Sequence, residues 1–303
     1  MLRSTLLQLA ASPGFAHWVT SNPHTRGMAR RFVAGETLDE AIMAARACNS
    51  LGMYASLDYL GENVSTTTDA QRARDAYLQI FDRIAEERLH ANVSCKLTQL
   101  GLDLSTEFCE GLLFSLVERA AGYENFLRVD MESSQYTQRT IDIVKRVRTR
   151  NPAVGTVIQS YLYRSEKDVQ NLLTVGCRIR LCKGAYKENI DVAFARKKDV
   201  DGNFVRLMKM LLPSGFFHGI ATHDPHMIAE TIRFAASRGI SKDDFEFQML
   251  YGVRTDLQRK LVKHGYRLRI YIPYGRDWFP YFMRRLAERP ANLGFFLRNF
   301  FRR

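Results

Sequence analysis

Short apolar runs alternate with longer amphipathic segments along most of this chain. The runs have the length and the β-branched or aromatic content of strands, and they lie at residues 53–58, 91–97, 126–131, 154–162, 177–182, 216–221, 245–250 and 267–272. The segments between them repeat apolar positions at helical spacing, and these segments lie at 69–90, 105–119, 135–149, 165–174, 203–212, 226–238 and 255–264. The pattern predicts eight strands that alternate with helices.

Eight successive strand–helix units in roughly 240 residues indicate an α/β protein of the (β/α)₈ barrel class. A doubly wound sheet would need fewer strands and a glycine-rich phosphate loop after the first one, and the sequence around Gly61 does not supply that motif. Residues 1–50 are predicted to be an N-terminal helical arm, in which Thr37 and Glu40 have capping-box spacing. Residues 51–303 are predicted to be the barrel, a single catalytic domain.

The composition narrows the range of partners and compartments. The formal net charge of +12 favours anionic partners such as phosphorylated cofactors, acidic substrates, nucleic acid or an anionic membrane surface. We find no helix-turn-helix, RNP or basic-repeat pattern, so we expect no nucleic-acid partner. The five scattered cysteines indicate a reducing compartment. No apolar stretch has the ~20 residues of a spanning helix, and the first residues are too weakly apolar for a signal peptide, so we expect a soluble or at most peripheral protein.

Polar side chains occur where each predicted strand ends. In a (β/α)₈ barrel these ends form the active site, and the residues concerned are Asp58 and Glu62, Lys96, Asp130, Gln159, Arg180 with Lys183, Thr222 with His223, Gln248, and Tyr271. Lys96, Arg180 and Lys183, together with Arg284 and Arg285 of the predicted last helix, give an excess of cations. This excess predicts a basic mouth that binds phosphates, a carboxylate or both.

Two neighbouring patterns in this set allow more than one interpretation. His223 and His226 could be metal ligands, but Pro225 between them indicates a turn into a helix, and we expect no metal site. Lys183 could form a Schiff base. Because Arg180 is close in sequence and Gly184 would let the backbone approach a ligand, phosphate binding is the better interpretation.

The predicted last helix carries two stripes of residues. Phe279, Phe282, Met283 and Leu286 have the spacing of a buried face. A second stripe consists of Tyr281, Arg284, Arg285 and Glu288. Two adjacent guanidiniums can grip a planar carboxylate. The alternative is a solvated face on which an Arg284–Glu288 pair contributes a few tenths of a kcal/mol.

Several motifs in this order resemble those of the proline dehydrogenases. They are Leu57–Asn63, Val93–Lys96, Val129–Glu132, Arg180–Tyr186, Ala221–His223, Glu246–Gly252 and the helix with Tyr281, Arg284 and Arg285. The resemblance covers nearly the whole chain and is closest to the compact, monofunctional bacterial enzymes. It implies a distorted (β/α)₈ barrel whose last helix lies over the mouth, and FAD as the cofactor.

The resemblance also implies roles for individual residues. Arg284, Arg285 and Lys96 would hold a substrate carboxylate, and Glu62 would pair with Arg284 to close the site. The other substrate-side residues of the motifs are Asp130, Tyr186, Tyr271, Tyr281 and Glu288. On the FAD side, Arg180 would lie near the flavin N5, and Gln159 and Gln248 would lie near the flavin ring. The remaining residues on the FAD side are Lys183, Gly184, Thr222 and His223.

The implied reaction is oxidation of L-proline to 1-pyrroline-5-carboxylate, with hydride passing from ring C5 to flavin N5 and electrons then passing to a membrane quinone. We therefore expect a cytoplasmic protein that is peripheral on the inner face of the cell membrane. The Phe- and Arg-rich segment 292–303 is predicted to dock on an anionic bilayer. The alternatives are another FAD barrel, such as a methylenetetrahydrofolate reductase-like enzyme, and a hydroxyproline dehydrogenase; Tyr271 favours proline over the latter.

Overall fold

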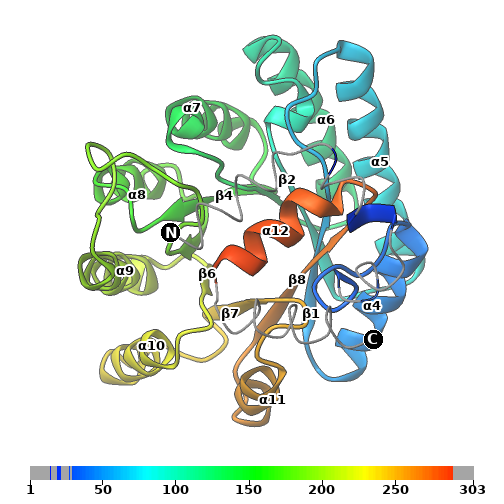
Figure 1. The fold of residues 1–303 in the computed structure, drawn as a ribbon. Coiled ribbons are helices and arrows are strands. Elements are labelled where there is room, and N and C mark those ends of the chain that lie inside the picture. The colour runs from blue at the N-terminus through cyan, green and yellow to red at the C-terminus, as the bar shows by residue number, and fades with distance from the viewer. Residues whose placement is uncertain (1–13, 15–18, 22–26, 28, 289–303) are drawn as a thin grey trace.

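Eight parallel strands close into one barrel in sequence order (Figure 1). The computed structural model describes residues 14, 19–21, 27 and 29–288, with side chains described as far as Arg285. The strands are β1 (Tyr54–Tyr59), β2 (Ala91–Cys95), β3 (Leu127–Val129), β4 (Val154–Gln159), β5 (Arg178–Cys182), β6 (His218–Ala221), β7 (Phe245–Leu250) and β8 (Leu268–Tyr274). The predicted barrel is confirmed, with each strand inside or within two residues of its predicted run.

Helices surround the barrel on its outside (Figure 1). They are α4 (Leu38–Ser50), α5 (Thr67–Glu86), α6 (Thr106–Gly122), α7 (Ser134–Arg150), α8 (Ser165–Leu173), α9 (Lys197–Leu211), α10 (Pro225–Ser237) and α11 (Thr255–Lys263), with short 3₁₀ turns η1 (Thr98–Leu100) and η2 (Leu212–Ser214). A further helix, α12 (Trp278–Glu288), follows β8. The capping box that opens α4 is present, because Thr37 and Glu40 exchange hydrogen bonds.

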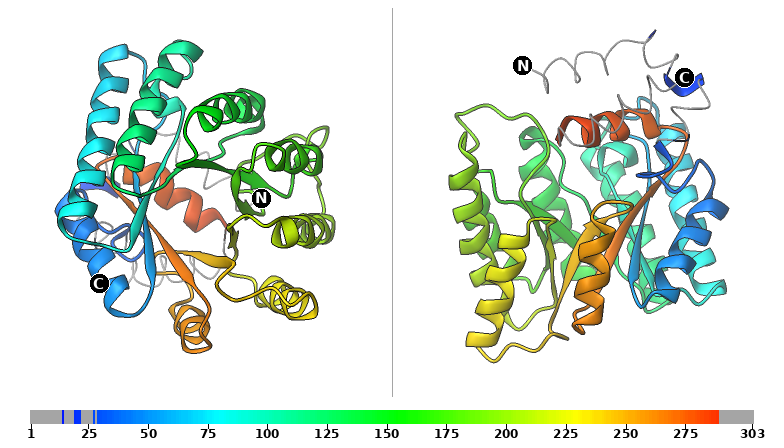
Figure 2. Two further views of the ribbon diagram at one scale, coloured as in Figure 1. Left: turned by 180° about the vertical axis from the view of Figure 1, so that it is seen from behind. Right: turned by 60° about the horizontal axis from the view of Figure 1, so that its bottom comes forward.

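The helix that follows β8 does not pack beside the strands. In a regular barrel that position lies between β8 and β1. Here α4 packs against both strands and buries Ala41, Ala45 and Cys48 in the main core. The last helix, α12, instead lies across the mouth, as the oblique view in Figure 2 shows. This is the distortion that the motifs implied.

The inside of the barrel is polar, whereas the space between strands and helices is apolar. On β5, Ile179 and Leu181 pack in the main core, and the alternate residue Arg180 bonds to side chains of β2 and β7 across the interior. Near the amino end of the barrel, Glu246 is paired with Arg269 at 2.7 Å. This polar interior fixes side chains that project toward the carboxyl ends.

Most of the predicted N-terminal arm before residue 29 lies outside the described residues, and so do two further predictions. The aromatic and basic C-terminal segment belongs to residues 289–303. Glu288 is the last residue of α12, and its side chain is outside the described part. Both remain predictions.

A buried histidine makes the fold sensitive to acid. His218 on β6 is fully buried; its Nδ1 accepts from Ile179 N at 3.0 Å, and burial together with Arg128 lowers its pKa to about 3. An unfolded histidine has a pKa near 6.5. Above about pH 6.5 the histidine is neutral in both the folded and the unfolded state, and its contribution to stability is fully present. As the pH falls from 6.5 toward 3, only the unfolded chain binds the proton, so the free energy of unfolding falls by about 1.4 kcal/mol per pH unit.

We therefore expect the free energy of unfolding to fall more steeply below pH 6.5 in the wild type than in His218→Gln. Denaturant unfolding at several pH values measures both slopes. Equal slopes would show that His218 is not held neutral by the fold.

Candidate functional site

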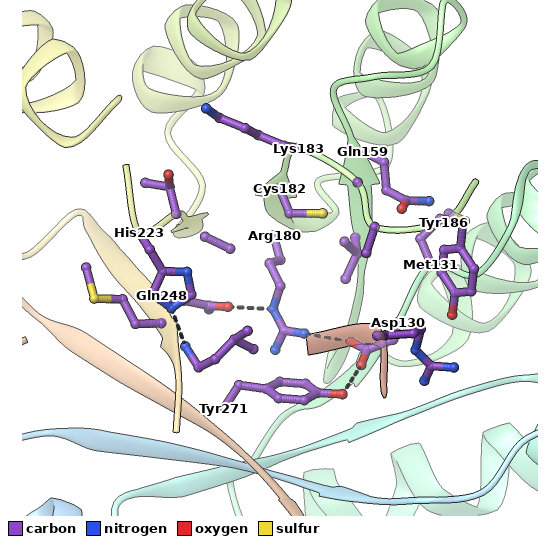
Figure 3. A pocket seen from close by; sticks show the side chains of 18 of the residues that line it. Asp130, Met131, Gln159, Arg180, Cys182, Lys183, Tyr186, His223, Gln248 and Tyr271 are labelled. Carbon is purple, nitrogen blue, oxygen red and sulfur yellow. Dashed lines mark hydrogen bonds and ion pairs between the residues drawn. The ribbon is translucent and has the colours of Figure 1, made fainter. Parts of the chain in front are cut away.

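A cavity of about 490 Å³ opens at the carboxyl ends of the strands, beneath α12. Figure 3 shows side chains that line it. Its lining includes most of the candidate residues: Lys96, Asp130, Gln159, Arg180, Lys183, Gly184, Tyr186, Thr222, His223, Gln248, Tyr271, Tyr281, Arg284 and Arg285. Glu62 is not part of the lining but bonds to a residue that is. The strand-end residues of this set lie in one site because all eight strands present their carboxyl ends to the same mouth.

Arg180 is the fixed cation at the base of the cavity. Its Nη1 donates to Asp130 Oδ1 at 2.6 Å, its Nη2 donates to Ser94 Oγ at 3.0 Å, and its Nε donates to Gln248 Oε1. Tyr271 donates to the other oxygen of Asp130 at 2.7 Å (Figure 3). The guanidinium is buried and held on several sides. It can stabilise negative charge beside it without reorganising.

A second buried ion pair lies on the β1–β2 side. Lys96 Nζ donates to both oxygens of Asp58, at 3.0 and 3.1 Å, and the Asp58 side chain is fully buried. Burial acts to lower the pKa of the Lys96 ammonium, but the Asp58 and Asp130 carboxylates outweigh it and raise that pKa. Lys96 is therefore charged where it reaches the cavity.

The side chains of α12 that the structure describes, which exclude those of Leu286 and Glu288, lie on two faces as the stripes predicted. Phe279, Phe282 and Met283 are buried in a cluster that also contains Phe32 and Leu60. This apolar contact holds the helix over the mouth.

The other stripe faces the cavity, because Tyr281, Arg284 and Arg285 line it. Arg284 Nη2 bonds to Glu62 Oε1 at 2.8 Å, so its described partner is Glu62 on the β1–α5 loop. Burial acts to lower the pKa of Arg284, but Glu62 outweighs it and raises that pKa. Arg284 and Arg285 thus present two guanidiniums together on the face of α12 that covers the cavity, and we call this face the roof.

The Glu62–Arg284 pair joins the first βα loop to the last helix. Each side chain is only about one-fifth exposed, at 23% and 21%. We expect Glu62→Ala and Arg284→Met to be coupled in a double-mutant cycle on kcat/KM, by at least 0.5 kcal/mol, because residues in direct contact are not additive. Strict additivity would show that the two side chains do not act together during turnover.

The part of the cavity next to the ends of β5 and β6 carries lysines and carboxylates. Lys183 lies between Asp201, at 2.5 Å, and Asp224, at 2.8 Å. Burial acts to raise the pKa of Asp224, but the bonds from Lys183 and from His226 N, together with the charges of Lys183 and Lys197, outweigh burial and lower that pKa to about 2. His223 Nε2 accepts from Leu250 N at 2.9 Å, so it links β6 to β7.

The structure adds lining residues that the sequence analysis did not select. They include Met131, Cys182, Lys197 and Asp224. Asp224 had a recognisable signal, since it precedes Pro225 and caps α10 by accepting from His226 N. Lys197 had none, because its place at the cavity depends on how the segment after β5 returns to the barrel.

Fold and site define a (β/α)₈ enzyme with a basic mouth that is closed by its own last helix. Comparison of the chain with known proteins identifies its family. The family model for proline dehydrogenase matches residues 41–298. The chain is 42% identical to proline dehydrogenase 1 of Bacillus subtilis over 90% of this chain and 91% of that one, and 40% identical to the proline dehydrogenase of Deinococcus radiodurans over 88% of each.

A solved structure also has the same fold. It is the proline utilization A protein of Bdellovibrio bacteriovorus inactivated by N-propargylglycine, with a TM-score of 0.82 and 26% identity over 87% of this chain and 33% of that larger one. The chain belongs to the proline dehydrogenase family. Enzymes of this family are FAD-dependent oxidoreductases.

The residues of the cavity fit FAD in their chemistry. Met131, Val157 and Met249, with the amide of Gln159, give the centre the mixed apolar and amide surface that a flavin ring needs, while Lys183 and Lys197 are suited to phosphates. Gly184 has φ +109°, and a Cβ there would lie 2.3 Å from the Tyr161 ring. A larger residue would therefore displace the backbone of this wall.

Lys183→Ala is expected to weaken FAD retention, because it removes a phosphate partner. Roughly a tenfold rise in the FAD Kd corresponds to the loss of one charge-assisted contact. Equilibrium dialysis measures it, with thermal unfolding of the apoprotein as a check on the fold. Lys198→Ala is the control, since Lys198 is exposed and does not line the cavity. A Lys183→Ala protein that binds FAD like the control would remove Lys183 from the cofactor site.

Proposed function

We propose that this protein oxidises L-proline to 1-pyrroline-5-carboxylate at the cavity beneath α12. The observation that carries the proposal is the convergence of Arg284, Arg285 and Lys96 on a cavity whose base is Arg180. Three cations at one end suit a small substrate with one carboxylate, and a fixed guanidinium at the base suits an electron-accepting cofactor.

In this proposal the roof binds and orients the substrate. Arg284 and Arg285 hold the carboxylate from above, and Lys96 holds it from the barrel wall. Tyr186 lies beside the roof, with its ring 6.0 Å from the Arg284 guanidinium, where it contacts the substrate ring. Holding the carboxylate fixes the distance between the substrate ring and the base of the cavity, which is the main contribution of a protein to such a transfer.

The residues at the base then serve the transfer itself. FAD held at this base would supply the redox chemistry, namely an acceptor for the hydride that leaves ring C5 of the substrate. Arg180, fixed by Asp130, Ser94 and Gln248, stabilises the negative charge that accumulates nearby. The Glu62–Arg284 pair closes the roof and excludes water.

Turnover of L-proline with a soluble dye as acceptor tests the substrate assignment. The expected product is a cyclic imine, which o-aminobenzaldehyde traps as a coloured adduct. D-Proline, 4-hydroxyproline and NADH are the comparison substrates, and L-proline should be preferred to each. FAD-loaded protein that oxidises NADH or hydroxyproline in preference to L-proline would overturn the proposal.

We further propose that electrons pass to a membrane quinone, and that the protein works in the cytoplasm at the inner face of the cell membrane. No helix in the part of the chain that the structure describes is long and apolar enough to cross a bilayer. A peripheral contact is supported by the net charge of +12, since each lysine or arginine near an anionic surface contributes roughly 1 kcal/mol.

Vesicles that contain a quinone test this second proposal. The protein should sediment with anionic vesicles more than with neutral ones, and proline-dependent quinone reduction should rise with bound protein. Equal sedimentation with both vesicle types, or proline turnover with dye but none with quinone, would overturn it.

A further inference from the structure

Glu132 is a buried carboxylate beside the active site that is not part of the cavity lining. It follows Asp130 by two residues at the carboxyl end of β3 and is 4% exposed. Its Oε2 accepts from Thr98 Oγ1 at 2.6 Å, and its Oε1 accepts from Thr98 N at 3.2 Å. Both oxygens of one carboxylate are thus used to hold a single residue, which lies at the start of η1.

Thr98 in turn supports the loop that carries Glu62. The Thr98 carbonyl accepts from Val64 N at 3.3 Å, two residues beyond Glu62. On the other side of Glu62, a Cβ on Gly61 would lie 2.5 Å from Gln99 Nε2, so the loop rests directly on the next residue of η1. The β1–α5 loop therefore takes its position from Thr98 and Gln99.

This loop also completes the roof, because Glu62 Oε1 is 2.8 Å from Arg284 Nη2. A continuous set of contacts runs from the Glu132 carboxylate through Thr98 and Val64 to the β1–α5 loop, and from Glu62 to α12. We propose that Glu132 is a positioning residue: it fixes Thr98, and thereby the loop whose Glu62 holds Arg284 over the bound substrate. The inference rests on the proposed proline oxidation and assigns a further residue to it.

The charge of Glu132 is sensitive to pH in the neutral range. Burial raises the pKa of this carboxyl to about 7, and the nearby Glu62 carboxylate also acts to raise it. The bonds from Thr98 and the Lys96 ammonium act to lower it. The titratable groups that interact with it are Lys96 at the end of β2, Glu62 on the β1–α5 loop, Cys109 on α6, Tyr136 on α7 and Tyr186 after β5. Protonation removes the negative charge that accepts both Thr98 bonds. The loop should therefore be held less firmly below about pH 7.

The test uses tetrahydro-2-furoate, a ring carboxylate without the amine of proline, which neither reacts nor titrates near neutral pH. Its Kd for the FAD-loaded enzyme is measured by flavin absorbance between about pH 5.5 and 8.5. In the wild type the Kd should rise by about five- to tenfold toward the acid end, the ratio expected when charge-assisted hydrogen bonds become neutral ones. Glu132→Gln should have the raised Kd at every pH, with little pH dependence.

Three further variants separate positioning from general damage. Thr98→Ser keeps the hydroxyl and should behave like the wild type, whereas Thr98→Val should resemble Glu132→Gln. In a Glu62→Ala background, adding Glu132→Gln should change the Kd less than about twofold, because the residue that it positions is gone. Because the Thr98 variants probe the same link, the proposal can be judged even if Glu132→Gln does not fold.

Two results would overturn the assignment of Glu132. One is a Kd in Glu132→Gln that follows the wild type across the pH range, and the other is an equal effect of Glu132→Gln with and without Glu62. Either could occur in an enzyme that oxidises proline normally, which leaves the proposed function intact. A wild type that oxidises no proline would overturn the proposed function, and this inference with it.

Discussion

Exchange of either roof arginine for methionine is expected to raise the KM for proline and to lower kcat/KM by roughly 10²-fold or more. A charge-assisted hydrogen bond contributes ~1.5–3 kcal/mol, and a substrate that is no longer held against the flavin loses further rate through misalignment. Arg284 and Arg285 both line the cavity, and Arg284 also loses its bond to Glu62 on substitution. Steady-state kinetics of each single variant with a soluble dye measures the effect.

Arg276→Met is the matched control for this prediction. Arg276 lies in the loop before α12, is exposed, and does not line the cavity. Its replacement removes the same charge from the same part of the protein and should leave kcat/KM within about twofold of the wild type, since exposed charges away from a site contribute little. Near-normal kinetics in both roof variants would favour the solvated-helix interpretation of this stripe.

Lys96→Met should destabilise the fold by about 3–5 kcal/mol as well as impair substrate binding. The substitution leaves the fully buried Asp58 carboxylate without the ammonium that it contacts at 3.0 Å, and an unpaired buried charge is among the most costly features of a protein interior. Denaturant unfolding of the variant and the wild type measures the difference in the free energy of unfolding.

The pH dependence of that loss identifies its cause. Burial raises the pKa of Asp58, and in the wild type the Lys96 ammonium opposes this. In Lys96→Met the folded-state pKa of Asp58 rises further above its unfolded value, so the folded state binds the proton more strongly. The variant should therefore regain stability as the pH falls through that raised pKa. The double variant Lys96→Met, Asp58→Asn should recover much of the loss at pH 8. An equal loss at all pH values, with no recovery in the double variant, would point to packing instead.

The barrel and its mouth could be predicted from the chain because both follow from local pattern. Eight short apolar runs separated by amphipathic segments admit few architectures, and the structure closes them in sequence order. The carboxyl ends of all the parallel strands then lie at the same mouth of the barrel, so a residue at such an end must lie there too. Lys96, Asp130, Arg180 and Tyr271 come from different strands, yet all of them line the same cavity.

The remaining features depend on contacts between segments far apart in sequence. The stripe on α12 offered Arg284 only Glu288 as a local partner. Its bond to Glu62, which is 222 residues away, was expected from the family motifs and not from the helical pattern. The position of α4 beside β8 depends on the outcome of packing rather than on its own sequence, which would suit any amphipathic helix. The bonds between Glu132 and Thr98 had no pattern that could reveal them.

Anaerobic mixing of the FAD-loaded protein with L-proline tests the central claim most directly. The flavin absorbance near 450 nm should bleach with L-proline. With L-prolinamide, which keeps the ring and the amine but lacks the carboxylate, bleaching should be at least about 100-fold slower at equal concentration, because the roof has no charge to hold. Equal rates with the two compounds, or no bleaching with L-proline, would contradict the assignment of the cavity beneath α12 as a carboxylate-gripping proline site.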